Sequence, residues 1–269
     1  MLLRLSTRFA RRILALATLG TLLGLGCTPL RAADQNPTTI RIAIGEWPPY
    51  TSEKLNGYGV GAKLISEAFA AAGVKVTYVF YPWNRSLELA RRGSVEATGT
   101  WFESADRRAD FHLSEPLYDS AFLLYYLKEK AIDWQTIDDL KGLKVGATTG
   151  YFYGEAFVHA EKAGEITVIR ASSDETNLKN LLRGRLDAFP LDQQVAEYML
   201  ANDLPAADAA RIGINAIAVH SRPQHLLISR KAANGEALTR LFNRGLATIR
   251  NNGVYERITK DATFSRAKP

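Results

Sequence analysis

Two adjacent arginines are candidates for binding an anion. Arg107 and Arg108 lie in "SADRRADFHLSEPLY", where an apolar-spaced run follows them and ends at a proline. A guanidinium is a planar, two-pronged donor that matches the two oxygens of a carboxylate. A bare pair of arginines is also typical of solvated charges at the start of a helix. The segment therefore leaves two interpretations open, an anion-binding side chain or surface charge.

Two aspartates in "GRLDAFPLD" supply the opposite charge. Asp187 comes with the expected strand "LDAFPL", and Asp192 follows five residues later at its C-terminal end. The carboxyl ends of parallel strands face the crevice of an α/β fold. Asp192 could equally be the N-cap of a helix over "QQVAEYML". From the residues alone, ligand contact and helix cap have equal weight.

A glycine turn is the third candidate. "LKVGATTGYFYGEAF" predicts a strand, a turn and a helix. The backbone N–H groups of Gly150, Tyr151 and Phe152 would then point out of a helix start, which favours an anion. The alternative is an ordinary helix with Thr149 as its N-cap, and both interpretations can hold together.

Aromatic residues in loops complete the candidate site. Trp47, Tyr50 and Trp83 follow expected strands and stand beside prolines. Their rings could stack on a ligand or on its aliphatic stem, or could form a partly buried lid. Arg85, in "PWNR", is a second candidate cation with the same solvated alternative. Thr100, in the expected strand "SVEATGTW", joins the candidate ligand contacts.

Catalytic, metal and cofactor motifs are not evident in the sequence. The four histidines are His112, His159, His220 and His225. They show neither metal-ligand spacing nor a Ser or Cys partner motif. "GYGVG" is glycine-rich but lacks the G-x-G-x-x-G form of a dinucleotide site. We therefore predict no catalytic residue, no metal and no cofactor.

The elements that must position these residues follow a repeated order of strand and helix. "TIRIAI" alternates as a strand does, "AKLISEAFAAAG" has helical spacing, and "KVTYVFY" is rich in β-branched and aromatic residues. This order predicts a parallel sheet covered by helices. After the apolar strand "SAFLLYYLKEK" the same order restarts, and the tail adds a strand, "HLLISRK", and helices. Two successive α/β units predict two lobes with a crevice between them, the default ligand site.

The first thirty-odd residues predict an export signal. Arginines at positions 4, 8, 11 and 12 precede the apolar run "ILALATLGTLLGLG", and small residues lead to an expected cleavage after Ala32. Cys27 lies within this segment. A lipoprotein anchor is one interpretation, but Gly24 stands where an aliphatic residue is usual, so we favour a removed cysteine. The mature chain would then have no disulfide and no thiolate chemistry.

The charge of the chain belongs mostly to that signal. Loss of residues 1–32 removes five arginines and no acid, which leaves 29 basic and 28 acidic residues from a chain of formal charge +6. A nearly neutral mature protein gives no electrostatic case for nucleic-acid binding. No second apolar run of membrane length follows, so we expect an exported protein that is free of the membrane.

Over residues 39–262 the chain resembles the periplasmic solute-binding proteins of ABC importers, specifically the polar amino-acid-binding family. The resemblance rests on the ordered segments "GEWPPYT", "SADRRADFHLSEPLY", "DLKGLKVGATTG", "LLRGRLDAFPLD" and "NNGVYERI". It implies an α/β, two-lobe periplasmic-binding-protein fold of type II. Lobe 1 would comprise residues 39–120 plus 222–262, and lobe 2 residues 121–219. Two crossover segments, near 119–122 and 218–224, would form the hinge.

The resemblance also implies a role for each charged candidate. Arg107 falls on the arginine that grips the ligand carboxylate, and Arg108 on a solvent-facing position. Asp192 falls on the acid that pairs with the ligand's ammonium group, across the cleft from Arg107. The implied protein is a monomer, not an enzyme. It captures an amino acid or related organic anion for an ABC permease in the inner membrane.

The chain departs from the family pattern around the pocket. Phe102 replaces a Ser or Thr that helps to hold the carboxylate, Tyr151 replaces a Thr, and "GVGA" lacks the usual acid of the first loop. The pocket is thus more aromatic, which leaves room for a bulkier zwitterion or another organic anion. A few dehydratases that act on cyclohexadienyl acids share the fold. That alternative needs a general acid or base, for which the candidates are Glu46, Glu103 and Glu155.

Overall fold

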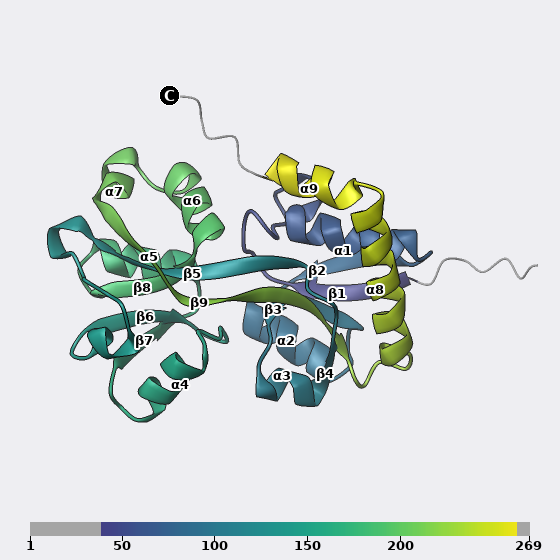
Figure 1. Cartoon of the computed structure of the whole chain (residues 1–269), viewed down its shortest axis with the longest axis horizontal. Helices are drawn as coiled ribbons and strands as arrows, with labels where there is room; N and C mark the ends of the chain where they lie inside the picture. The colour runs from purple at the N-terminus through teal and green to yellow at the C-terminus, as the bar shows by residue number, and fades with distance from the viewer. Residues whose placement is uncertain (1–38, 263–269) are drawn as a thin grey trace, which may run out of the picture. The chain divides into compact units, whose positions relative to one another are not determined.

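Residues 39–262 are described by a computed structural model, so the predicted signal at 1–32 and Cys27 lie outside the described residues. Three parallel strands, β1, β2 and β3, come first in the described chain and are joined by helices (Figure 1). We call them the first strand set. Its elements are β1 (Thr39–Ile44), α1 (Val60–Ala71), β2 (Lys75–Phe80), α2 (Trp83–Arg91) and β3 (Ala97–Phe102). β3 is buried along its whole length. The predicted parallel strand order is confirmed for this set.

A second strand set repeats the order later in the chain. β6 pairs in parallel with β7 on one side and with β8 on the other. Its strands are β6 (Lys144–Thr148), β7 (Thr167–Ala171) and β8 (Ala188–Asp192). Its helices are α4 (Glu155–Lys162), α5 (Asp174–Leu182), α6 (Gln193–Asn202) and α7 (Ala206–Arg211). The strands run toward Thr148, Ala171 and Asp192, so the side chains that follow them gather at one edge.

Two long antiparallel strands connect the two sets. They are β5 (Tyr118–Leu127) and β9 (Ile212–Ser229), which run side by side in Figure 1. β9 also pairs with β3 and with β4 (Phe111–Leu113), so the sheet order is β2-β1-β3-β9-β5-β8-β6-β7. The segments 119–122 and 218–224, predicted as crossovers, pair with each other in this ladder.

β9 is longer than the sequence predicts. The apolar run "HLLISRK" covers only its buried C-terminal part, whereas residues 214–222 are exposed or half-buried. Residues 214–222 carry no apolar alternation, so their strand conformation comes from pairing with β5.

The remaining helices pack on the first strand set. α3 (Ala105–Asp110) precedes β4, and α8 (Gly235–Asn251) and α9 (Val254–Ala262) end the described chain. α8 lies against α1, and the two helices approach so closely that Gly245 faces the backbone of Ala68. Short 3-10 turns lie at Asn56–Tyr58, Lys128–Lys130 and Ile137–Leu140. Within residues 39–262, no helix is both long enough and apolar enough to cross a bilayer.

Candidate functional site

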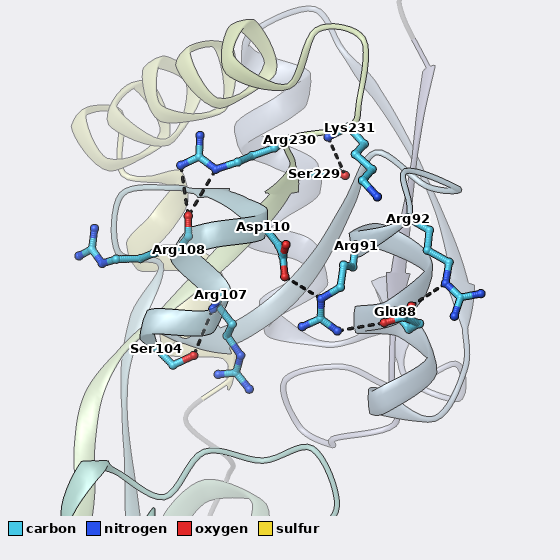
Figure 2. A network of polar contacts seen from close by, with 10 residues as sticks. All are labelled: Glu88, Arg91, Arg92, Ser104, Arg107, Arg108, Asp110, Ser229, Arg230 and Lys231. Atoms are coloured by element: carbon cyan, nitrogen blue, oxygen red, sulfur yellow. Dashed lines mark hydrogen bonds and ion pairs between the residues drawn. The ribbon is translucent and has the colours of Figure 1, made fainter.

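The two neighbouring arginines of α3 occupy opposite environments. Ser104 caps the helix by accepting a hydrogen bond from Arg107 N at 3.4 Å. Arg107 is 5% exposed, whereas Arg108 is exposed and forms an ion pair with Glu103. Figure 2 shows the two side chains leaving the helix in different directions. The structure thus places one arginine inside and the other in solvent.

The buried guanidinium of Arg107 is bonded to carbonyls alone. Nη1 donates to Phe102 O at 2.6 Å, and Nη2 donates to Gly150 O at 3.2 Å across to the second strand set. The guanidinium also lies 4.6 Å from the centre of the Trp101 ring. No acid of residues 39–262 forms an ion pair with it, and burial lowers its pKa to about 10. A charged, buried cation without a counter-ion is a ready partner for an anion.

A small cavity of about 20 Å³, partly open to solvent, borders this arginine. Among the predicted contacts, those that line it are Trp47, Trp83, Thr100, Arg107, Tyr151 and Phe152. Phe102, which the resemblance places at the pocket, also lines it. The lining residues that sequence reasoning did not propose are Trp101, Phe122 and Gln224. This volume holds about one water molecule, so a solute would enter only after the cavity walls move apart.

Aromatic rings form the walls of this cavity. The Trp47 ring meets Phe122 and Tyr151 edge-on at centroid distances of 6.4 and 6.3 Å, and Phe122 stacks on Tyr151 at 6.2 Å. Trp83 is fixed because its Nε1 donates to Glu46 O at 3.1 Å. Rings from both strand sets and from β5 therefore converge on one space, where they can bury the apolar part of a ligand.

Two buried polar atoms on the cavity wall have no hydrogen-bond partner. They are Nε1 of Trp47, which is 4% exposed, and Oε1 of Gln224, which is 2% exposed. Buried unsatisfied groups are uncommon in native proteins, so Gln224 Oε1 marks a place where a polar ligand can bond. Trp47 Nε1 lies against the Asp174 carboxyl instead, and lowers the pKa of that group. Thr100 Oγ1, by contrast, accepts from Tyr118 Oη at 2.8 Å.

Asp192 caps a helix, as one of the two interpretations predicted. Its Oδ1 accepts from the N–H groups of Gln194 at 2.9 Å and Val195 at 3.1 Å. Its Oδ2 accepts from Ser120 Oγ at 2.5 Å. Burial raises the pKa of this carboxyl to about 6, although these hydrogen bonds act against the rise.

Tyr50 lies beside this acid rather than on the cavity wall. Its ring stacks on Tyr118 at 4.7 Å, and burial together with the charge of Asp192 raises the pKa of its hydroxyl. Asp192 itself carries no cationic partner within residues 39–262. The cap uses one carboxylate oxygen and leaves the other facing Ser120.

The predicted helix start at Gly150 is wrong. α4 begins at Glu155 after the N-cap Gly154, so Thr149 is not its cap. Gly150 has a φ of 86°, and Tyr151 N is already bonded to Thr148 O at 3.1 Å. The glycine lets the chain turn so that Gly150 contributes its carbonyl to a cation, not its N–H to an anion.

Arg85 does not reach the cavity. It is exposed, and its guanidinium lies 4.5 Å from the centre of the Tyr81 ring. Of the two alternatives for Arg85, a solvated arginine at the start of a helix agrees with this exposed position.

A second buried acid, Asp174, lies near the same rings. It is the first residue of α5 and is 7% exposed. Oδ1 accepts from Thr148 Oγ1 at 2.5 Å, and Oδ2 accepts from Tyr151 Oη at 3.2 Å. Burial raises the pKa of the Asp174 carboxyl to about 6. Sequence reasoning did not propose Asp174 as a site residue, because an acid in the first turn of a helix is a common stabilising feature.

The three glutamates proposed for catalysis lie away from the cavity wall. Glu46 and Glu155 are exposed, and Glu103 pairs with Arg108. Among the described residues, no group of His, Cys, Asp and Glu is arranged to hold a metal ion.

The fold and the site together define a class. A mixed α/β sheet, whose two parallel strand sets are joined by a pair of long antiparallel strands beside a buried arginine, has the architecture of the two-lobe periplasmic-binding-protein fold. The chain belongs to the bacterial extracellular solute-binding proteins, family 3, which it matches over residues 40–263. This is a family of amino-acid-binding solute-binding proteins.

Individual relatives are distant but cover most of the chain. The lysine/arginine/ornithine-binding periplasmic protein of Escherichia coli (strain K12) is 24% identical over 229 residues, which cover 83% of this chain and 87% of that protein. An ancestral arginine-binding protein bound to arginine has a similar structure, with a TM-score of 0.70, 20% identity, and coverage of 84% and 98% of the two chains. The ancestral amino acid-binding protein AncCDT-1, a precursor of cyclohexadienyl dehydratase, has a TM-score of 0.66 at 18% identity, with coverage of 83% and 94%. At these identities the two structures show a shared fold.

Proposed function

We propose that the protein captures a small amino acid in the cavity beside Arg107 and delivers it to an ABC importer. The observation that carries this proposal is a buried guanidinium that faces the cavity without an acidic partner among the described residues. The carboxylate of the solute would supply that partner as a two-pronged acceptor. The names of the relatives, which bind amino acids, support the same substrate class.

The second strand set would bind the other end of the solute. The ammonium group pairs with Asp192 through the oxygen that does not cap α6. Micromolar affinity requires about 8 kcal/mol, whereas one charged hydrogen bond contributes about 1.5–3 kcal/mol net. The aromatic walls therefore supply much of the binding free energy through burial.

Binding would close two lobes on the solute. We assign residues 39–120 plus 222–262 to lobe 1 and residues 121–219 to lobe 2, with β5 and β9 as the hinge. The Arg107 to Gly150 hydrogen bond already joins the two parts. A solute that contacts both shifts the equilibrium toward closure because it binds the closed state more tightly.

The cellular context follows from this role. Export through the segment 1–32 would bring a monomer to the periplasm, where an inner-membrane permease takes the solute from the closed protein. A dehydratase activity is the weaker proposal, since none of Glu46, Glu103 and Glu155 lines the cavity. Turnover of prephenate or arogenate by the purified protein would reverse that preference.

The decisive experiment compares Arg107→Ala with Arg108→Ala. Calorimetric titration of the exported form with a panel of amino and organic acids first identifies the solutes that bind. Arg107→Ala should weaken each hit by about 10- to 100-fold, because a charged hydrogen bond to the carboxylate is lost. Arg108→Ala should bind as the wild type does, since its side chain is exposed and paired with Glu103. Full affinity in Arg107→Ala would overturn the carboxylate assignment.

A further inference from the structure

Asp174 is a buried carboxylate that the helix it belongs to does not use. The cap of α5 is Ser173, whose Oγ accepts from Thr176 N at 3.2 Å. The oxygens of Asp174 accept from the side-chain hydroxyls of Thr148 and Tyr151, and the indole N–H of Trp47 also lies against this carboxyl. The carboxylate is therefore turned away from its own backbone toward the space where Tyr151 stands.

A chain of hydrogen bonds fixes the orientation of this carboxylate. Asn177 Nδ2 donates to Thr148 Oγ1 at 3.0 Å, so the hydroxyl proton of Thr148 is directed to Asp174. The Tyr151 hydroxyl can only donate to a carboxylate, and it does so over the longer distance of 3.2 Å. Two ordered donors hold Asp174 as an acceptor with lone pairs left for a further donor.

The rings around Asp174 are the rings of the cavity. Tyr151 and Trp47 both line it, and they meet edge-on at 6.3 Å. Trp47 also lies near enough to lower the pKa of the Asp174 carboxyl, yet its buried Nε1 completes no hydrogen bond of ordinary geometry. Asp174 thus stands directly behind the aromatic wall, with the indole N–H of Trp47 beside it.

The charges around the cavity do not balance. Asp174 and Asp192 are both buried in the second strand set, and neither has a cationic partner within residues 39–262. Arg107 is the buried cation of the first strand set. A solute with one carboxylate and one ammonium group would neutralise Arg107 and Asp192 and leave Asp174 without a counter-ion. A solute with a second cationic group would satisfy all three residues.

We propose that Asp174 is a specificity-determining residue that selects amino acids with a second cationic group, an amine or a guanidinium, on the side chain. The Trp47 and Tyr151 rings contact each other edge-on in this structure, so the stem of that side chain would lie between them only after they part. The faces of both rings attract a cation. The cationic end reaches the carboxylate beside the Tyr151 hydroxyl. This inference rests on the proposed function and names the solute class for the same site.

The test uses pairs of solutes that differ in charge and little in shape. Arginine is compared with citrulline, and lysine with norleucine, by calorimetry at neutral pH. The wild type should prefer the charged member of each pair by about tenfold or more, as expected for a charged hydrogen bond. Asp174→Asn keeps the size of the side chain and should remove this preference, while the affinity for citrulline and norleucine stays within about twofold.

Glu175→Gln is the matched control. Glu175 is the next residue of α5, is exposed, and pairs with Lys179. Its substitution removes the same charge from the same helix turn, so a preserved preference in this variant excludes a general electrostatic effect. Circular dichroism and thermal melting confirm that each variant is folded.

The outcomes separate the two proposals. Equal affinity for charged and neutral partners in the wild type, a comparison that needs no variant, overturns the role of Asp174 and leaves amino-acid binding in place. If Asp174→Asn still prefers the charged solute of each pair, the role of Asp174 is likewise overturned and amino-acid binding is unaffected. If none of the four solutes binds and Arg107→Ala changes nothing with any other acid, the proposed function fails and this inference fails with it.

Discussion

One step along a short helix decides whether an arginine faces a cavity or the solvent. Consecutive helical residues are rotated by about 100°, so Arg107 and Arg108 cannot share a face. The cap at Ser104 sets where the helix starts and hence which of the two points inward. At the scale of single residues, the inward position of Arg107 therefore depends on a hydroxyl that does not line the cavity.

Two buried acids predict opposite effects of pH on stability and on binding. The carboxyls of Asp174 and Asp192 have pKa values raised to about 6 by burial. As the pH falls from about 7 to about 5, the folded protein takes up protons that the unfolded chain does not, so these groups raise the free energy of unfolding. Over the same range an ammonium ligand loses its ionised partners, so its affinity falls.

Denaturant unfolding of the wild type and of Asp174→Asn at both pH values measures the first effect. The wild type should gain stability relative to the variant on acidification, and contributions from other acids such as Glu88 cancel in the comparison. Calorimetry on the wild type measures the second effect. Parallel pH profiles for the two proteins would contradict the assignment of a raised pKa to Asp174.

The close contact of α1 and α8 sets a requirement at the scale of helices. A Cβ added at Gly245 would lie 1.7 Å from Ala68 O and 2.7 Å from Ala68 C. These are backbone atoms of α1 and cannot rotate away. Gly245→Ala should destabilise the protein by about 1–3 kcal/mol despite the better helix propensity of alanine, and lower Tm by about 2–4 °C per kcal/mol.

Thr248→Ala is the comparison for this substitution. Thr248 lies in the same helix and is exposed, so its change should remain within about 0.5 kcal/mol of the wild type. Equal Tm values for Gly245→Ala and Thr248→Ala in a thermal melt would show that the two helices do not approach as closely as described.

The elements were predictable where local pattern and tertiary contact agree. β1 and α1 carry clear apolar periodicity and lie where the sequence predicts them. The helix after Gly150 begins later, and β9 extends far beyond its apolar end, because a turn and a long ladder decide those boundaries.

The site shows the same limit. Arg107, Trp47 and Tyr151 stand in segments whose position after a strand indicates a site. Asp174 stands at the start of a helix, where an acid is common for local reasons, so its sequence position does not indicate a site. Gln224 points inward only because β9 is paired on both sides. Their roles depend on contacts with residues far away in the chain, which periodicity does not report.

At the scale of the whole molecule, the tryptophans report on the cavity. Of the four in the chain, Trp47, Trp83 and Trp101 line it, whereas Trp134 is buried elsewhere and donates from Nε1 to Ile217 O at 2.9 Å. A solute that enters the cavity should therefore change the intrinsic fluorescence. Trp134→Phe should keep this change, and Trp47→Phe should lose a large share of it. A signal carried by Trp134 would place binding elsewhere.

The position of β9 in the sheet has a consequence for biosynthesis. β9 is the last strand to be made, yet it lies between β3 and β5, which are made much earlier. At about 5–20 residues per second, a nascent chain waits on the order of ten seconds with these two strand edges open. Open edges are templates for aggregation, so on the ribosome this protein depends on protection until nearly its whole length has emerged.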